Sequence, residues 1–146
     1  MLAACVRGQL KVAKHLARAG GRRLLLQTDA DGCSCLHVAS VAGHLELVEF
    51  LMGKVGEELI LAQTPGGTCL HAAVYRGHRH VAKRLVQAGG KALLDMVDAG
   101  GDSCLDIAAA KGDLEATRLL VEAGGRALIP ETDDPRETCL HKAARG

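Results

Sequence analysis

The chain of 146 residues carries a net charge of +1, and only 1% of its residues are aromatic, with no Trp. This composition argues against a single deep core and favours a thin two-layer stack filled by Leu, Val and Ala. No apolar run approaches the ~20 residues that a membrane-spanning helix needs, so we expect no contact with a membrane.

A short phrase recurs along the chain. It consists of a hydroxyl residue, Cys, Leu and then His or Asp, and it begins at Ser34, Thr68, Ser103 and Thr138. These starts are 34, 35 and 35 residues apart. A period of this size is typical of stacked supersecondary units rather than of one globular core. Such stacks are binding surfaces, and the partner lies outside the sequence.

Two helices are predicted in each unit. A Ser or Thr that opens the phrase is a good N-cap, because its hydroxyl accepts a hydrogen bond from an unpaired N–H of the first turn. In the second helix of one unit, the apolar residues that share one face are Leu45, Val48, Leu51 and Met52. Glycines end both helices, since Gly readily adopts positive φ. They are Gly43, Gly77 and Gly112 for the first helix, and Gly20-Gly21, Gly89-Gly90 and Gly124-Gly125 for the second.

An apolar pair and then a turn follow the second helix. The pairs are Leu24-Leu25, Leu59-Ile60, Leu93-Leu94 and Leu128-Ile129. The first of the turns is residues 29–32, Asp-Ala-Asp-Gly, and Asp beside Gly is typical turn chemistry. The predicted unit is therefore helix, helix and projecting turn.

These units resemble the ankyrin repeat family, whose consensus runs Asp-x-x-Gly-x-Thr-Pro-Leu-His-x-Ala-Ala-x-x-Gly-His-Leu. Residues 29–45 and 66–78 are similar to that line. The resemblance implies an all-α ankyrin-repeat solenoid of stacked helix-turn-helix pairs with projecting turns or β-hairpin loops. It also implies one domain over residues 1–146, with repeats at 1–28, 29–62, 63–97, 98–132 and 133–146, the first and last being partial.

The sequence departs from the family pattern in three ways. Cys replaces the motif Pro at Cys35, Cys69, Cys104 and Cys139, so each helix start is expected to be less preorganised. The unit exceeds the usual ~33 residues, and the extra length lies around the apolar pair. Asp106 replaces the motif His and Arg136 replaces the turn Gly, so we expect altered hydrogen bonding and turn shape there.

Both ends of the chain fall inside a predicted repeat. Residue 1 aligns within a first helix, and residue 146 ends just before the glycine that should open a second helix. We therefore expect a monomeric fragment of a longer array. The segment 1–23 is basic, Ala-rich and without acidic residues, as a mitochondrial presequence would be. It also aligns without gaps to residues 72–92, which favours a repeat.

Six cysteines raise the question of disulfides, metal binding and catalysis. Helices in adjacent layers lie about 8–10 Å apart, whereas a disulfide needs Cα atoms within about 7 Å. Cys33, Cys35 and His37 resemble a zinc or reactive-thiol cluster, which stays an alternative, although zinc sites normally use another spacing. A Cys and His pair that recurs in three units indicates architecture rather than an enzyme. We expect no cofactor, and reduced thiols favour the cytoplasm or the nucleus.

Net charge alternates along the predicted repeats. It is +6 for residues 1–28, −5 for 29–62, +4 for 63–97, −4 for 98–132 and zero for 133–146. One aligned column of the second helix reads Lys11, Glu46, His80 and Glu115, which predicts ion pairs between layers. The alternation argues against a nucleic-acid partner, because such a partner would favour a continuous basic face.

The resemblance implies a concave binding face formed by the turn tips and the first helices. The residues of this chain at those positions are Arg7, Asp31, Cys33, Val41, Thr64, Pro65, Tyr75, Arg76, Asp102, Lys111, Asp134 and Arg145. Tyr and Arg most often dominate interface energy, so Tyr75 and Arg76 are the expected centre. Arg7, Arg76 and Lys111 share an aligned position and could meet an acidic segment. The sequence thus predicts a non-catalytic scaffold that binds another protein, with a passive spacer as a further alternative.

Overall fold

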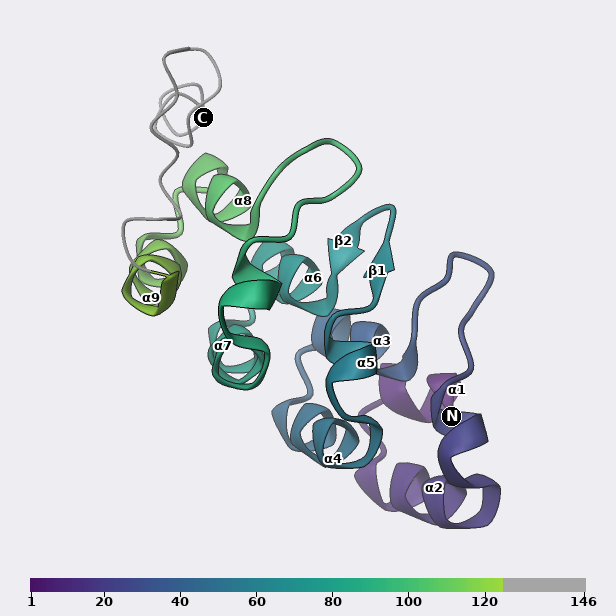
Figure 1. Cartoon of the computed structure of the whole chain (residues 1–146). Helices are drawn as coiled ribbons and strands as arrows, with labels where there is room; N and C mark the ends of the chain where they lie inside the picture. The colour runs from purple at the N-terminus through teal and green to yellow at the C-terminus, as the bar shows by residue number, and fades with distance from the viewer. Residues whose placement is uncertain (125–146) are drawn as a thin grey trace.

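Helices form two parallel rows in the computed structural model, which describes residues 1–124 (Figure 1). The inner row contains α1 (Leu2–Val6), α3 (Cys35–Ala42), α6 (Cys69–Arg76) and α8 (Cys104–Ala110). The outer row contains α2 (Leu10–Leu25), α4 (Leu45–Val55), α7 (Arg79–Leu94) and α9 (Leu114–Gly124). The predicted all-α solenoid of stacked helix pairs is confirmed. Within the described residues no helix is both long and apolar enough to cross a bilayer.

The hydroxyl residue of each described phrase, Ser34, Thr68 or Ser103, caps an inner helix, as predicted. Ser34 Oγ accepts a hydrogen bond from the His37 amide at 3.4 Å. Thr68 Oγ1 lies 2.9 Å from His71 Nδ1, and the Thr68 amide donates to the same nitrogen at 3.1 Å. At the start of α8 the Asp106 carboxylate takes over this role and accepts from the Ser103 amide at 2.9 Å. The cap therefore survives the replacement of His by Asp.

Glycines with positive φ end the outer helical segments of the first three units, and a short third helical turn follows each of them. Gly21 and Gly90 have φ of 57° and 54° inside α2 and α7. Gly56 has φ of 70° and separates α4 from α5 (Glu57–Ile60). The extra residues of each unit were expected here, but not that they are helical. Within the described residues this turn buries at least one member of its apolar pair, because apolar surface is stabilised by leaving water. The buried residues are Leu25, Leu59, Ile60, Leu93 and Leu94, whereas Leu24 is only partly buried.

Each described motif cysteine is the first residue of an inner helix and is buried. Cys35 Sγ donates to the Leu25 carbonyl at 3.2 Å, and Cys69 Sγ donates to the Ile60 carbonyl at 3.4 Å. Both acceptors belong to the third helical turn of the preceding unit. The thiol thus fixes the helix start by a hydrogen bond that Pro could not make.

The connecting turns project beside the inner row. One is a hairpin of β1 (Gln63–Thr64) and β2 (Gly67–Thr68), paired antiparallel. The turns before α3 and α8 contain a single bridge each, between Thr28 and Ser34 and between Val97 and Ser103. The projecting loops are therefore confirmed, although only one turn of the described chain closes into a two-stranded ladder.

Ion pairs connect neighbouring layers, but not through the predicted column. Arg22 lies 2.7 Å from Glu58, Arg84 lies 2.7 Å from Glu49, and Arg79 lies 3.0 Å from Asp113. In each pair the acidic residue lies one position away from the residue that aligns with its Arg in the neighbouring repeat. The facing helices are therefore not in strict register. Within residues 1–124 no salt bridge connects members of the predicted column. Its Glu115 instead lies 3.7 Å from Arg118 on its own helix.

Candidate protein-binding surface

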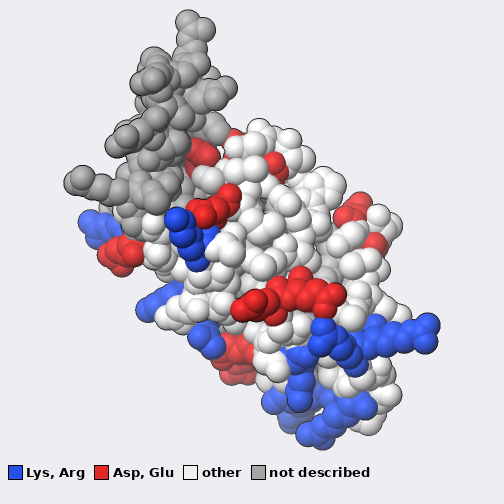
Figure 2. Space-filling view, in the orientation of Figure 1, with Lys and Arg blue, Asp and Glu red and all other residues white. Residues whose placement is uncertain are grey.

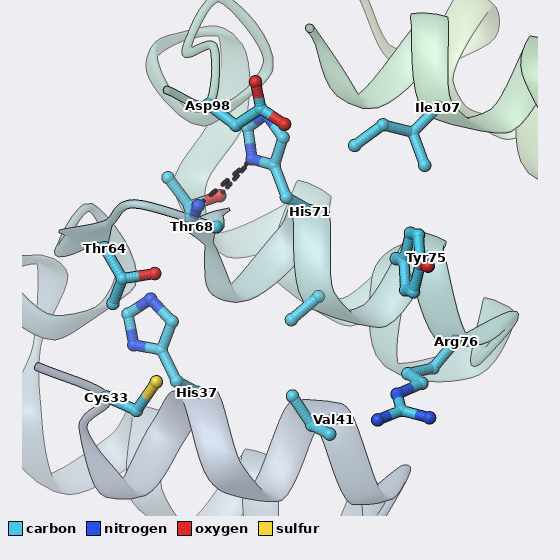
Figure 3. Close-up of a pocket in the computed structure, with 12 residues that line it drawn as sticks. Cys33, His37, Val41, Thr64, Thr68, His71, Tyr75, Arg76, Asp98 and Ile107 are labelled. Carbon is cyan, nitrogen blue, oxygen red and sulfur yellow. Dashed lines mark hydrogen bonds between the residues drawn. The ribbon is translucent and has the colours of Figure 1, made fainter. Parts of the chain in front are cut away.

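A hollow of about 380 Å³ lies between the projecting turns and the inner helices α3, α6 and α8. Its lining comes from three successive units, as Figure 3 shows for the labelled residues. The lining residues are Cys33, His37, Val41, Thr64, Gly66, Thr68, His71, Ala72, Tyr75, Arg76, Asp98 and Ile107. We call this hollow the concave groove. An elongated ligand that lies along the stack would contact all three units.

The apolar centre of the groove is formed by Val41, Tyr75 and Ile107. The Tyr75 side chain is 61% exposed although its ring forms part of the wall. Lys111 Nζ lies 4.7 Å from the centre of that ring. A cation–π contact at an exposed site contributes about 0.5–1 kcal/mol. This contact holds the ring in place, so less side-chain entropy would be lost when a partner covers it.

Cations gather at the carboxyl-terminal ends of the inner helices. Arg7 and Lys111 are the C-caps of α1 and α8, and Arg76 is the last residue of α6. Basic side chains are favoured there by the negative end of the helix dipole. The row predicted from the aligned positions therefore exists in the structure, but only Arg76 of the three lines the groove.

Two of the three turns beside the inner helices contain an Asp whose carboxylate holds the backbone of its own turn in place. Asp29 Oδ1 accepts from the amides of Asp31 and Cys33 at 3.0 and 2.8 Å. Asp98 Oδ1 accepts in the same way from Gly100 and Asp102 at 2.8 and 3.0 Å. Of these carboxylates Asp98 alone lines the groove, which also contains the cation Arg76.

The floor between these charges is kept neutral by two buried histidines. Burial lowers the pKa of His71, although the Asp102 carbonyl that lies 3.2 Å from Nε2 opposes this. Burial likewise lowers the pKa of His37, and the Gly67 backbone opposes it. No hydrogen bond of regular geometry joins His37 Nε2 to a described residue. Both rings therefore stay uncharged at neutral pH, and the charge of the groove lies at its rims.

The structure brings together some of the predicted contact residues and leaves others apart. Those that line the groove are Cys33, Val41, Thr64, Tyr75 and Arg76. Those outside its lining are Arg7, Asp31, Pro65, Asp102 and Lys111, of which Lys111 contacts the Tyr75 ring. Asp134 and Arg145 lie outside the described residues.

Two functional candidates in the groove were missed by the sequence analysis. Ile107 occupies the position aligned with Ala72, directly after the motif His or Asp. Because the previous unit has Ala at this position, the large apolar side chain of Ile107 could have been recognised in the sequence as a candidate contact. Asp98 lies in the same unit as the predicted contacts Asp102 and Lys111, but no local pattern in the sequence distinguishes it from the other turn aspartates. Its placement depends on the stacking of α6 against α8.

Family models match most of the chain. A model described as ankyrin repeats (3 copies) matches residues 57–129, and a model described as ankyrin repeat matches residues 31–62. The chain belongs to the ankyrin repeat family. No curated protein matches the chain closely. Ankyrin repeats generally mediate protein–protein interactions, and ankyrin repeat proteins are typically non-catalytic scaffolds.

Two described thiols of this ankyrin repeat chain, Cys35 and Cys69, are held in structural hydrogen bonds. Burial raises the pKa of the Cys69 thiol to about 12. The Cys35 thiol interacts with Cys5, which raises the pKa of Cys35 and lowers that of Cys5. An activated nucleophile needs a thiolate beside a base, whereas His37 Nδ1 lies 3.0 Å from Ser34 Oγ and Cys35 donates to a carbonyl. The predicted alternative at Cys33, Cys35 and His37 is therefore not assembled, and residues 1–124 contain no group of three metal-ligating side chains.

Proposed function

We propose that the concave groove binds a segment of another protein, with Tyr75 and Arg76 as its main contacts. The observation that carries this proposal is the exposed Tyr75 ring, fixed by Lys111 in the wall of a hollow that three units share. Full burial of a large apolar side chain contributes about 1.5–3 kcal/mol. Because the groove is already formed, its side chains and loops lose little conformational entropy when the partner binds.

The charges at the groove rims support a partner segment with two kinds of side chain. Arg76 would meet a carboxylate of the partner, while the Asp98 carboxylate favours a basic group on the partner. The floor offers Val41 and Ile107 to an apolar side chain. We therefore favour an amphipathic segment that lies across the neutral histidines. Its partner protein would be recognised in the compartment where the thiols stay reduced.

Affinity capture followed by mass spectrometry tests this proposal. The test variant is Tyr75→Ala/Arg76→Glu, and the matched control is His80→Ala/Lys83→Glu, whose residues are exposed on α7 outside the groove. Circular dichroism must show equal helicity for both variants. We expect a protein captured by the unmodified chain and by the control, and lost with the test variant. Equal capture by both variants would place the interaction elsewhere, and a passive spacer predicts no specific capture at all.

A further inference from the structure

A second hollow, of about 350 Å³, lies in the outer row between α2 and α4. Its lining residues are Lys14, Ala17, Arg18, Gly21, Arg22, Leu25, Phe50 and Lys54. Four of these residues are cationic and none is acidic. We call it the outer basic hollow. Figure 2 shows Lys and Arg side chains gathered over this end of the molecule, at the lower right of the view.

Among residues 1–124 the cations of the outer basic hollow are only partly compensated by acidic side chains. Lys14 and Arg18 are four residues apart on α2, where like charges destabilise a helix by about 0.2–0.5 kcal/mol. Arg22 pairs with Glu58 at 2.7 Å, and both side chains remain more than half exposed. Lys14 Nζ lies 5.8 Å from the Phe50 ring. A ligand with negative charge would relieve the repulsion that remains.

The corresponding hollow between α7 and α9 differs in charge. It is lined by Arg79, His80, Lys83, Glu115, Arg118, Leu119 and Glu122. Here the acidic residues offset the basic ones, and Arg79 also pairs with Asp113 at 3.0 Å. Repeat architecture alone therefore does not produce a basic hollow. Three of the four cations come from the first layer, where residues 1–28 carry +6, and Lys54 of α4 supplies the fourth.

The floor of the outer basic hollow is apolar. Leu25 is 3% exposed, and Phe50 is half-buried and is the only Phe in the sequence. Acidic residues lie beside the hollow, since Glu58 pairs with its lining residue Arg22 and Glu57 precedes Glu58 at the start of α5. A long polyanion such as a nucleic acid would meet these carboxylates and the acidic second layer beyond them. These neighbouring carboxylates favour a short ligand. A short segment with carboxylates on both sides of one apolar side chain would pair with the cations and would place that side chain on the apolar floor.

We infer that the outer basic hollow binds a short acidic segment of a partner protein, in which one apolar side chain lies between Asp or Glu residues. The apolar side chain packs on Leu25 and Phe50. Its flanking carboxylates pair with Lys14, Arg18 and Lys54. None of these residues lines the concave groove, so this interaction and the proposed function can fail separately.

Fluorescence anisotropy with a labelled peptide, Gly-Ser-Asp-Glu-Leu-Glu-Asp-Ser-Gly, tests the inference. The test variant is Lys14→Glu/Arg18→Glu, and the matched control is Lys83→Glu/Lys91→Glu, which makes the same change in charge on α7. We expect the test variant to weaken binding about tenfold or more, equivalent to at least about 1.4 kcal/mol. The control is expected to bind nearly as the unmodified chain does. Circular dichroism establishes that both variants are folded.

Two further probes separate the contributions of charge and apolar contact. A peptide with Asn and Gln in place of its acids is expected to lose binding, and one with Gly in place of Leu is expected to bind several-fold more weakly. Equal weakening by the two charge variants would overturn the inference, because only net charge would then matter. Single-stranded DNA that binds as tightly as the acidic peptide would overturn it in favour of a general polyanion site.

Discussion

Replacement of Gly43 by Ala tests how neighbouring repeats are held together. Gly43 ends α3 with φ of 77° and ψ of 20°, and the His78 ring of the next unit packs against it. A Cβ atom at Gly43 would lie 2.5 Å from His78 Nδ1. The His78 ring would have to move, and its Nε2 contact with the Val41 carbonyl at 3.0 Å would be lost.

Gly77 provides a matched control for this substitution. It ends α6 with the same φ of 77° and ψ of 20°, but a Cβ atom there would meet no heavy atom within 4 Å. Both substitutions incur about 1–2 kcal/mol of left-handed backbone strain. Loss of the His78 hydrogen bond adds about 0.5–1.5 kcal/mol for Gly43→Ala alone. We therefore expect losses of roughly 1–2 kcal/mol for Gly77→Ala and roughly 1.5–3.5 kcal/mol for Gly43→Ala.

Urea unfolding monitored by circular dichroism measures both losses, provided that the m-values agree and the transitions stay cooperative. In a background of His78→Ala, the further loss caused by Gly43→Ala should fall to the value for Gly77→Ala. Equal losses for the two glycines in the unmodified background would refute the reasoning. They would mean that the packing of the His78 ring on Gly43 contributes nothing between repeats.

Three more predictions follow from the buried ring, the ion pairs and the thiols. Because burial lowers the pKa of folded His71 below its ordinary value of 6.5, the unfolded state binds more protons just below that pH. The stability from neutral His71 is thus complete above 6.5 and is lost as the pH falls towards the folded pKa. Urea unfolding at several pH values should show a smaller acid loss for His71→Gln, and an unchanged loss would contradict this. A double-mutant cycle on Arg84 and Glu49 should give a coupling of about 0.2–1 kcal/mol that decreases with salt, whereas no coupling at low salt would remove the interlayer role of this exposed pair. Iodoacetamide should label half-buried Cys33 before Cys69, whose pKa is raised to about 12 by burial. Peptide mapping by mass spectrometry measures the two rates, and comparable rates would show that Cys69 is accessible.

The fold could be predicted from the sequence because each unit depends on local chemistry. The hydroxyl caps, the helix-ending glycines and the apolar faces act within a few residues of each other, so their spacing carries the information. Repetition then made each signal visible more than once. The resemblance to the ankyrin repeat family, rather than this local chemistry, placed Tyr75 and Arg76 on the face that contains the groove.

What the sequence did not predict depends on contacts between units. The column of Lys11 and Glu46 was expected to pair, but facing helices are offset, and the pairs use residues one position away from the aligned ones. The third helical turn was missed because four residues after a glycine carry too little periodicity to distinguish a helix from a turn.

The sequence by itself determined the repeat, its two helices and the alternation of charge, since each of these depends on residues that lie close together in the sequence. Tertiary structure alone decided that Ile107 and Asp98 share the concave groove with Cys33, and that the cations of α2 surround an apolar floor with Phe50 on α4. The physical reason is that a groove or a hollow forms between repeats. Its lining depends on how one layer is shifted and packed against the next.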